Sequence, residues 1–349
     1  MKIIDLFAGV GGLSHGFTMA GFEVAFAVEH DKEIANTYQQ NHITTDVFSD
    51  DIEKLDIKQV SEKYKNIDVI VGGPPCQGFS QKGKRLSLND SRNYLFKYFI
   101  DFVKIFEPKY FLLENVPNIT TTSDGFFKDE ILKAFNDMGY IVDVKILNAI
   151  KFGIPQNRKR AFFLGRKGTR QLELPTTNNV TTTIKEAIYD LPFINSGEGQ
   201  EFYEYETLAA TKYQKLMRKN SQGFYNHQAT KHTKIALERL ALIPKGKGKE
   251  VLPIEHRTKS IFSGTWTRLK EDEFAPTLTT RFDTPSSGMF THPILDRCIT
   301  VREGARIQSF PDKFIFYGNK SSQLKQVGNA VPPLLAFEIA KIILNDNRL

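Results

Sequence analysis

The first 165 residues alternate short apolar runs with longer stretches of helical periodicity, and this alternation constrains the fold more than any other feature. Short strands separated by amphipathic helices are typical of βαβ units, which build a parallel sheet. The run IDVIVGG at 67–73 is apolar on consecutive positions, as expected for a strand covered by helices on both faces. The sequence therefore predicts a doubly wound α/β domain.

The predicted elements follow from the apolar pattern and from residues that end helices. The predicted strands are Ile3–Phe7, Val24–Val28, Ile67–Val71, Tyr110–Leu113, Ile141–Leu147 and Arg160–Leu164. The predicted helices are Asp31–Gln40, Asn93–Phe106, Phe127–Met138, 301–310 and a final helix that opens at Pro332-Pro333 and runs to Leu344. We expect the apolar face of the final helix to pack on the first domain.

The stretch from about Gly168 to Arg297 lacks this regularity and contains polar runs such as TTNNVTTT at 176–183. A second, smaller and irregular domain is the simplest interpretation. With 40% hydrophobic and 25% charged residues, the chain is close to the globular average, which excludes disordered and collagen-like classes.

Other classes are excluded by single features of the sequence. Cys76 and Cys298 lie far apart, so we expect neither a disulfide framework nor a zinc site, and no other metal. The N-terminus lacks the apolar run of a signal peptide, and no run of about 18 apolar residues predicts a membrane span. We expect a cytosolic protein.

The net charge of +7 is distributed unevenly. Residues 212–260 contain 12 Lys and Arg against three Asp and Glu, a local charge of +9, so the remaining residues sum to −2. A basic segment of this kind indicates a polyanionic partner, although a solvated surface explains it equally well.

Ligands of open parallel sheets bind beyond the carboxyl ends of the strands, so the residues that follow each predicted strand indicate whether a binding site is present. A glycine turn at 8–12 follows the first strand, and Glu29, 20 residues after Gly9, ends the second. A carboxylate there accepts ribose hydroxyls and favours an adenosine-containing ligand. The GxGG pattern differs from the GxGxxG of dinucleotide sites, which leaves a nicotinamide dehydrogenase as a less favoured alternative.

Reactive side chains follow the next two strands. Cys76 stands between two prolines and Gln77-Gly78, a place to present a thiolate, although a lone cysteine is more often a small buried hydrophobe. Glu114 closes an apolar strand, where burial of a carboxylate is costly unless it is paired or used in catalysis. The alternative is that Glu114 only caps the next turn. The run QNRKR at 156–160 brings two arginines to the same edge.

Seven segments then occur in order: DLFAGVGGLSHGF, VEHD, GGPPCQGFS, ENVPN, QNRKRAFFLG, RLKEDEFAPTLTTR and QVGNAVPP. Together they resemble the DNA cytosine-5 methyltransferase family of the bacterial restriction–modification type. The resemblance implies a Rossmann-like doubly wound domain that depends on S-adenosylmethionine, formed by residues 1–167 and 328–349. It also implies a smaller target recognition domain at 168–300 and a hinge at 301–327.

The resemblance implies a mechanism that meets a chemical need. Carbon 5 of cytosine is a weak nucleophile, and attack on carbon 6 by Cys76 converts the ring into a reactive enamine. Glu114 would supply a proton or hydrogen bond to ring nitrogen 3, and Arg160 and Arg158 would hold the base. Because the target lies inside a duplex, the cytosine would have to be flipped out of the stack.

The resemblance also implies binding residues. Those for S-adenosylmethionine are Phe7, Gly9, Gly11, Leu13, Glu29, Asp51, Ile52, Pro75, Leu95, Asn329 and Val331. Those for DNA are Gln77, Ser80, Lys82, Lys84, Arg85, Lys245, Lys247 and Lys249. His30 stands where the family often has an aromatic residue that stacks on adenine, and Asp51 is preferred to its neighbour Asp50 because it precedes Ile52.

The expected partner is double-stranded DNA, and no membrane is expected. We expect a monomer in the bacterial cytoplasm, associated with the nucleoid, which protects host DNA from a restriction endonuclease without binding it stably. Two alternatives remain open: a cytosine-5 methyltransferase that acts on tRNA, and a catalytically silent relative that only binds DNA.

Overall fold

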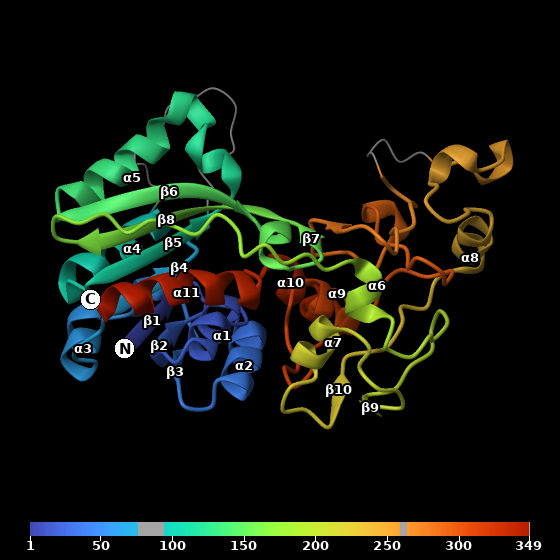
Figure 1. The fold of residues 1–349 in the computed structure, drawn as a ribbon, viewed down its shortest axis with the longest axis horizontal. Coiled ribbons are helices and arrows are strands. Elements are labelled where there is room, and N and C mark those ends of the chain that lie inside the picture. Colours follow the sequence, from blue (N-terminus) through green and yellow to red (C-terminus); the bar gives the residue numbers. More distant parts are fainter. Residues whose placement is uncertain (76–93, 259–263, 349) are drawn as a thin grey trace. The chain divides into compact units, whose positions relative to one another are not determined.

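The structure is a computed structural model that describes residues 1–75, 94–258 and 264–348 (Figure 1). The chain divides into two compact units. The first unit contains residues 1–148, 159–178 and 333–349, and the second contains 149–158 and 179–332. The predicted hinge at 301–327 therefore belongs to the second unit, together with 328–332, because the chain returns to the first unit only at Pro333.

The first unit is built on a seven-stranded sheet with the order β3-β2-β1-β4-β5-β8-β6. Its strands are β1 (Lys2–Leu6), β2 (Glu23–Val28), β3 (Asp46–Phe48), β4 (Val69–Gly72), β5 (Tyr110–Asn115), β6 (Tyr140–Asn148) and β8 (Lys159–Lys167). The pairs from β3 to β5 are parallel, which confirms the doubly wound α/β prediction. The three-residue β3 was missed because so short a run shows no periodicity.

One strand departs from the predicted parallel sheet. β8 pairs antiparallel with β5 on one side and with β6 on the other. Only residues 149–158 separate β6 from β8, and a connection of this length is too short for the crossover that a parallel pair requires. The chain therefore turns back, and β8 enters the sheet from the opposite end.

Helices cover the sheet of the first unit (Figure 1). They are α1 (Gly12–Met19), α2 (Lys32–Asn41), α3 (Ile57–Lys63), α4 (Tyr94–Phe106), α5 (Phe126–Asn136) and α11 (Pro333–Asn347), with 3₁₀ turns η1 (Ile52–Lys54), η3 (Pro117–Thr120) and η4 (Thr122–Gly125). α11 packs on α1 as expected: a Cβ on Gly16 would lie 2.4 Å from the Pro333 carbonyl oxygen. This contact returns the C-terminal segment to the first unit.

Aromatic side chains fill much of the core between α4, α5 and the sheet. Phe111 of β5 stacks on Phe135 of α5 with ring centroids 3.9 Å apart, and Phe99 of α4 meets both rings edge-on. Gly165 of β8 leaves the space that the Phe111 ring occupies, because a Cβ there would lie 1.9 Å from it. Each such buried ring stabilises the fold by roughly 1.5–3 kcal/mol.

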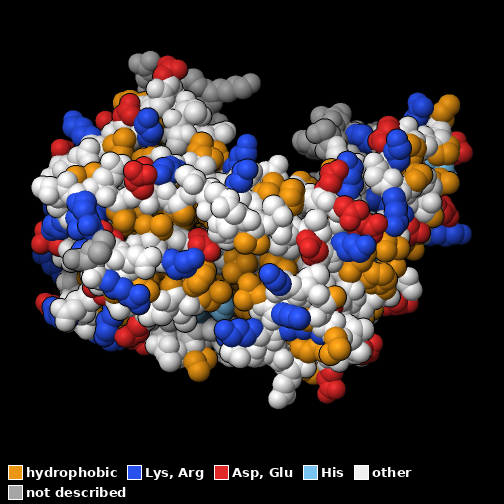
Figure 2. All heavy atoms as spheres, viewed as in Figure 1, with side chains coloured by type: hydrophobic (Ala, Val, Ile, Leu, Met, Phe, Trp, Pro, Cys, Tyr) orange, Lys and Arg blue, Asp and Glu red, His pale blue; other side chains and the backbone are white. Residues whose placement is uncertain are grey.

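The second unit contains short elements joined by long irregular segments, in agreement with the sequence pattern. Its helices are α6 (Ile184–Ile188), α7 (Lys212–Met217), α8 (Lys234–Ala241), α9 (Val301–Ile307) and α10 (Lys320–Asn329). Its strands are β7 (Gln156–Asn157), β9 (Phe202–Glu204), β10 (Gly223–Tyr225) and β11 (Ala275–Pro276), with 3₁₀ turns η5 (Ala149–Phe152), η6 (Lys249–Val251), η7 (Ile254–His256) and η8 (Pro285–Ser287). Figure 2 shows basic and acidic side chains mixed on the surface around α8.

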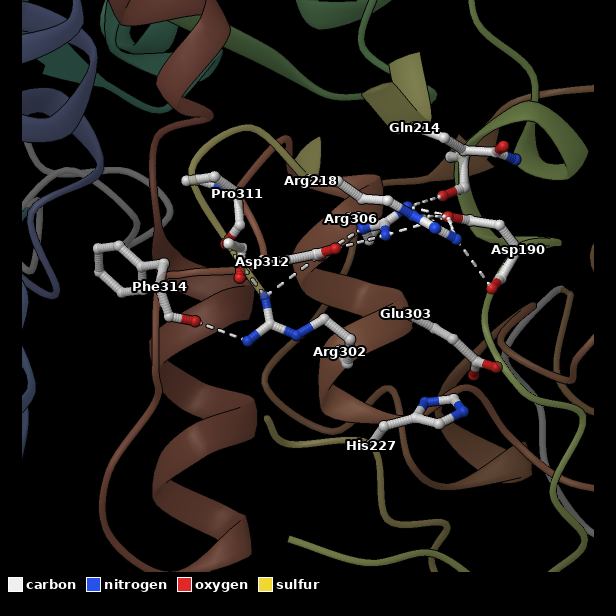
Figure 3. A network of polar contacts seen from close by, with 12 residues as sticks. Asp190, Gln214, Arg218, His227, Arg302, Glu303, Arg306, Pro311, Asp312 and Phe314 are labelled. Carbon is white, nitrogen blue, oxygen red and sulfur yellow. Dashed lines mark hydrogen bonds and ion pairs between the residues drawn. The ribbon is translucent and has the colours of Figure 1, made fainter. Parts of the chain in front are cut away.

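A buried network of arginines organises the second unit around α9 (Figure 3). Arg306 donates through Nε to Asp312 at 2.5 Å and through Nη1 to Asp190 at 3.1 Å. Arg302 donates to the carbonyl oxygens of Phe314 at 2.6 Å and Pro311 at 3.2 Å. Buried charges of this kind are tolerated because they are paired and hydrogen-bonded, and removing one partner is strongly destabilising.

One stretch is apolar and long enough for a membrane span by length and composition alone, although the sequence has no uninterrupted run of about 18 apolar residues. Lys320–Asn347, which contains α10 and α11, reaches a mean hydropathy of 1.5. Of the 18 most apolar consecutive residues in this stretch, 61% are buried inside the protein, as is usual for a core helix.

Candidate active site

The glycine loop after β1 turns sharply away from the sheet. Phe7, Gly9 and Gly11 all have positive φ angles, of 57°, 56° and 86°. Gly11 also has no room for a side chain, since a Cβ would lie 2.5 Å from His42 Cε1 and 2.7 Å from Tyr38 Cε2. At Gly9, by contrast, a Cβ would point into open space. The loop therefore has open space beside half-buried Gly9, whereas Gly11 is pressed against Tyr38 and His42.

Glu29 follows β2 and binds the glycine loop directly. The Gly9 N–H donates to Oε2 and the Asp31 N–H donates to Oε1, each at 2.9 Å. The carboxylate is buried, and exposed His30 lies 3.2 Å from Oε1. A carboxylate has about four lone-pair sites, so Glu29 retains acceptor capacity for further hydroxyl groups.

A buried polar chain lies beneath this loop, and sequence reasoning missed it. Ser14 of α1 donates to Asp5 of β1 at 2.6 Å and lies 2.7 Å from the hydroxyl of Tyr38 in α2. Burial raises the pKa of Asp5 to about 7, the Ser14 hydrogen bond opposes this rise, and the Glu29 charge adds to it. A carboxylate inside the apolar run IIDLF was the available signal.

The residues expected near adenine lie after β3. Asp50 is half-buried and pairs with Lys54 at 2.9 Å, whereas Asp51 caps η1 by accepting from the Glu53 N–H at 3.1 Å. Ile52 and Leu13 are buried, and Leu95 packs partly buried against the core that contains Ile52. Both carboxylates thus have a partner, and the choice of Asp51 for the adenine edge stays a prediction.

The segment after β4 leads toward Cys76 and is held by the end of β5. Asn115, buried, donates through Nδ2 to the Pro74 carbonyl at 3.0 Å. A Cβ at Gly73 would lie 2.9 Å from Glu114 Oε2, so the glycine allows the carboxylate to approach the backbone. Pro75 is exposed, and Cys76 lies outside the described residues. Asn115 is a further residue that sequence reasoning did not single out.

Glu114 and Arg160 form an ion pair at this sheet edge. Glu114 stands opposite Phe162 in the antiparallel β5–β8 pair, so Arg160, two residues along β8, projects from the same face. Arg160 Nε lies 2.9 Å from Glu114 Oε1, and the two side chains are only 17% and 14% exposed. Oε1 therefore faces Arg160, whereas Oε2 faces Gly73.

Three of the predicted catalytic and cofactor-binding residues belong to the second unit. Arg158 is buried there and donates through Nη2 to the Asn329 carbonyl at 3.2 Å. Asn329 is exposed at the end of α10, and Val331 is buried. The structure thus gives Arg158 a backbone partner within its own unit.

The predicted DNA contacts divide into two groups. Gln77, Ser80, Lys82, Lys84 and Arg85 lie outside the described residues. Lys245 and Lys247 are exposed in the second unit, Lys249 is half-buried, and Lys245 lies 3.5 Å from Glu271. Lys245, Lys247 and Lys249 thus place positive charge on the segment that runs from the end of α8 into η6.

The geometry of the first unit defines a class of protein. A glycine loop with open space beside it and a buried carboxylate suit a nucleoside cofactor, and a Glu–Arg pair beside a Pro-Pro turn places a carboxyl group and a cation at the same sheet edge. These features describe a Rossmann-like enzyme that performs polar chemistry on a second substrate.

The comparisons with known proteins identify the family. The sequence profile of C-5 cytosine-specific DNA methylases matches residues 1–345. Type II methyltransferase M.DdeI of Desulfomicrobium norvegicum is 42% identical over 98% of this chain and 88% of its own length. Type II methyltransferase M1.HphI of Haemophilus parahaemolyticus is 36% identical over 99% of this chain and 87% of its own length. The chain therefore belongs to the C-5 cytosine-specific DNA methylase family and is a DNA cytosine-5 methyltransferase.

Solved structures agree with this assignment. A putative DNA modification methyltransferase encoded within an E. coli prophage superimposes with a TM-score of 0.81 at 32% identity, with both chains fully covered. Spodoptera frugiperda DNMT2 gives a TM-score of 0.65 at 17% identity over 98% of this chain and 99% of its own, which shows the shared fold. The family generally uses S-adenosylmethionine as its methyl donor.

Proposed function

We propose that this enzyme methylates carbon 5 of a cytosine within a specific double-stranded DNA sequence, through a flipped base and a covalent Cys76 adduct at carbon 6. The observation that carries the proposal is the Glu114–Arg160 pair, which lies beside the backbone leading to Cys76. The family membership supports the substrate class, and the geometry of the first unit is compatible with the roles that we propose.

The glycine loop and Glu29 fit S-adenosylmethionine. A Cβ at Gly9 would meet open space, which leaves room for a ligand beside the loop, and Glu29 retains acceptor sites for the two ribose hydroxyls. Phe7, Gly11 and Leu13 would surround the methionine part, and Asp51, Ile52, Pro75, Leu95, Asn329 and Val331 would complete the pocket. When bound, this cofactor supplies an electrophilic methyl group.

The two oxygens of Glu114 have different tasks in this proposal. Oε1 is held by Arg160, which fixes the orientation of the carboxyl group. Oε2 faces Gly73, three residues before Cys76, and would carry the proton or hydrogen bond to nitrogen 3 of the flipped cytosine. Arg160, with Arg158, would also hold the base as charge develops on it.

The covalent steps need a methyl group from the cofactor and an acceptor for the carbon 5 proton, for which we propose a water molecule. The Cys76 thiolate forms a carbon–sulfur bond at carbon 6, and the displaced electron pair is stabilised at nitrogen 3 by Glu114. After carbon 5 has been methylated, the water molecule takes its proton, the electrons of the carbon–hydrogen bond form the ring double bond, and the carbon–sulfur bond breaks, which restores the aromatic ring and the thiolate. Asn115 supports these steps by holding the Pro74 carbonyl, two residues before the nucleophile.

The second unit would contain the surface that recognises DNA. It includes residues 179–332, which cover most of the predicted target recognition domain, and the exposed cations Lys245 and Lys247. Such cations make sequence-independent phosphate contacts. Gln77, Ser80, Lys82, Lys84 and Arg85 would contact the DNA around the flipped base.

The similarity to type II methyltransferases supports a role in protecting bacterial host DNA from a cognate restriction endonuclease. The two enzymes would share a recognition sequence without forming a stable complex. In this role the methyltransferase would act as a cytoplasmic, nucleoid-associated monomer.

A methyl-transfer assay tests the proposal. The purified protein is incubated with labelled S-adenosylmethionine and either double-stranded DNA or tRNA, and the methylated cytosines in the DNA are then located by sequencing. We expect label in DNA at one cytosine of a short recurring sequence. Label in tRNA alone would establish the alternative substrate, and label in neither would contradict the proposal.

A further inference from the structure

A hydrogen bond between two buried side chains closes the glycine loop at its base. The Ser14 hydroxyl of α1 donates to Asp5 Oδ2 of β1 at 2.6 Å, and the whole glycine loop lies between these two residues in the sequence. Both side chains are fully buried. Because this bond joins the two ends of the loop, a change in the charge of Asp5 acts directly on the loop.

Tyr38 of α2 connects this hydrogen bond with Gly11 of the loop. Its hydroxyl lies 2.7 Å from Ser14 Oγ, and its Cε2 would lie 2.7 Å from a Cβ on Gly11. His42 stacks on Tyr38 with ring centroids 4.3 Å apart and also borders the position of that Cβ. The loop therefore packs on the side chains that surround the Ser14 hydroxyl.

The two oxygens of Asp5 differ in their partners. Oδ2 accepts from Ser14, whereas no hydrogen bond from the described part of the chain reaches the buried Oδ1. An ionised carboxylate is unfavourable in such a place, because burial removes the water that would stabilise its charge. Burial accordingly raises the pKa of Asp5 to about 7, and the Ser14 hydrogen bond opposes this rise. Asp5 therefore holds a proton below neutral pH.

Charges at the proposed cofactor site act on Asp5. Asp5 stands opposite Ala27 in the parallel β1–β2 pair, and Glu29, which accepts from the Gly9 N–H, follows Ala27 by two residues. Burial is the main cause of the raised pKa of Asp5, and the negative charge of Glu29 raises this pKa further. A positive charge bound at the same loop has the opposite sign and therefore favours the ionised form of Asp5.

The buried neighbours of Asp5 on α2 and β4 carry no charge near pH 7. At the end of α2, burial lowers the pKa of His42 to about 4, and burial raises the pKa of Tyr38, so both side chains are neutral. On β4 the residue opposite Asp5 is the apolar Val71. These neighbours therefore do not neutralise an ionised Asp5.

Two imidazoles near the loop have to be separated from Asp5 by experiment. The backbone N–H of His15 in α1 donates to the Gly11 carbonyl at 2.8 Å, and this histidine is buried. His30 is exposed, and its Nδ1 lies 3.2 Å from Glu29 Oε1. A proton gained or lost by either imidazole would also make cofactor binding depend on pH.

S-adenosylmethionine and its product differ in charge. The cofactor carries a positive sulfonium, and transfer of its methyl group leaves the neutral thioether of S-adenosylhomocysteine. Charges that are buried in a protein are screened much less than charges on its surface. A buried carboxyl group at the base of the loop thus responds to the first molecule and not to the second.

We propose that Asp5 is the counter-charge that distinguishes S-adenosylmethionine from S-adenosylhomocysteine. Asp5 releases its proton to solvent when the sulfonium binds, and takes up a proton from solvent after the methyl group has been transferred. The Ser14 hydrogen bond strengthens when its acceptor is ionised, which holds the loop more firmly around the cofactor than around its product. This inference rests on the proposed function, since it requires S-adenosylmethionine at the glycine loop.

Calorimetric titration measures the affinity of the purified enzyme for each molecule between pH 5.5 and pH 8.5. Titrations in two buffers of different ionisation enthalpy give the number of protons released on binding. Asp5→Asn removes the ionisable group, and Ser14→Ala removes its hydrogen bond. Asp46→Asn is the matched control, an exposed aspartate of the same unit, and His15→Gln and His30→Gln remove the two imidazoles.

Near pH 6 the wild-type enzyme should release up to one proton more with S-adenosylmethionine than with S-adenosylhomocysteine. The ratio of the two affinities should rise by up to about tenfold from pH 6 to pH 7 and level off above pH 7. Both effects should vanish in Asp5→Asn and persist in Asp46→Asn and in the two histidine variants. Ser14→Ala should move the rise to higher pH, because the Ser14 hydrogen bond opposes the effect of burial on Asp5.

A rise that persists in Asp5→Asn, or that is lost in a histidine variant instead, would overturn the inference. Equal proton release with both molecules would also overturn it, since Asp5 would then respond to occupancy and not to charge. If Asp5→Asn does not fold, an unchanged midpoint in Ser14→Ala has the same consequence. An enzyme that methylates DNA without this difference leaves the proposed function intact, whereas one that binds neither molecule contradicts both.

Discussion

Arg160 Nε lies 2.9 Å from Glu114 Oε1, so one oxygen of the carboxylate is engaged by a cation while the other faces the backbone before Cys76. The relationship follows from the antiparallel entry of β8, which places Arg160 on the same face as Glu114. A parallel strand at this position would have carried its own carboxyl end, and not its first residues, to the edge where β5 ends.

Glu114→Gln should reduce methyl transfer strongly and leave cofactor affinity nearly unchanged. Glutamine keeps the shape of the side chain but cannot donate a proton at Oε2, and general acid catalysis typically contributes 10²–10⁴-fold. Single-turnover rates and calorimetric titration with S-adenosylhomocysteine measure the two quantities. The control is Glu107→Gln, which removes an exposed carboxylate paired with Lys167 at 2.9 Å. An unchanged rate for Glu114→Gln would remove this residue from the acid role.

Cys76→Ala should abolish methylation and retain DNA binding, because flipping the base does not require the covalent bond. Cys298→Ala is the matched control, since Cys298 is the only other cysteine and is buried with a raised pKa in the second unit. Electrophoretic mobility shift and methyl-transfer assays on the same DNA compare the two variants. Near wild-type methylation by Cys76→Ala would show that the covalent mechanism is wrong.

The sheet edge could be predicted because local sequence determines it. Apolar runs identified six of the seven strands, and the residues that follow a parallel strand meet the ligand-binding edge whatever the rest of the chain does. This is why Glu29 and Glu114 could be placed at this edge of the sheet from the sequence alone. The direction of β8 was missed, although the short connection 149–158 contained the necessary information.

Contacts between distant segments could not be predicted in the same way. Asp5 occupies one position of an apolar strand, and nothing near it indicates that Ser14 and Tyr38 will meet its carboxylate. Arg158 and Arg160 stand two residues apart, yet they belong to different units because the chain changes units between them. The number of charged residues in a segment also does not show which of them form ion pairs, so the ion pair between Lys245 and Glu271 was not expected.

Gly11→Ala should weaken cofactor binding much more than Gly21→Ala. Both glycines have positive φ angles, 86° and 93°, so each alanine costs about 1–2 kcal/mol of backbone strain. Only at Gly11 would the new Cβ also collide with His42 and Tyr38, which would displace the loop at a further cost of roughly 1–3 kcal/mol. Titration with S-adenosylhomocysteine should show about tenfold or greater weakening for Gly11→Ala alone. Equal affinities of the Gly11→Ala and Gly21→Ala variants for S-adenosylhomocysteine would show that the conformation of this loop does not affect cofactor binding.

Asp5→Asn should change how stability depends on pH. Burial raises the pKa of Asp5 from 3.8 to about 7, so the folded state holds a proton that the unfolded state releases. The stability that this protonation gives is present below pH 4 and is lost as the pH rises to 7, by up to about 1.4 kcal/mol per unit. Urea unfolding at pH 5 and pH 8 should therefore show a gain for Asp5→Asn, relative to wild type, that is larger at pH 8.

The control for this experiment is Asp46→Asn. Asp46 is exposed, and hydrogen bonds from Tyr64 and Lys63 lower its pKa, so its contribution is present above pH 4 and is lost only as the pH falls further. Its difference from wild type should be the same at pH 5 and pH 8. If the Asp5→Asn difference is likewise constant between these values, Asp5 is not the buried acid described.

Neutralising Lys245, Lys247 and Lys249 together should weaken DNA binding and flatten its salt dependence. Each lysine that contacts a phosphate contributes about 0.9 to the slope of log K against log salt concentration, and Lys245 should contribute least because Glu271 already lies 3.5 Å from it. The control removes the same charge from exposed lysines of the first unit, Lys58, Lys63 and Lys65. Affinities measured from 50 to 300 mM salt should give a slope lower by roughly two for the first variant only. An identical slope for both variants would mean that the basic segment is a solvated surface, and that the charge excess at 212–260 has no part in binding DNA.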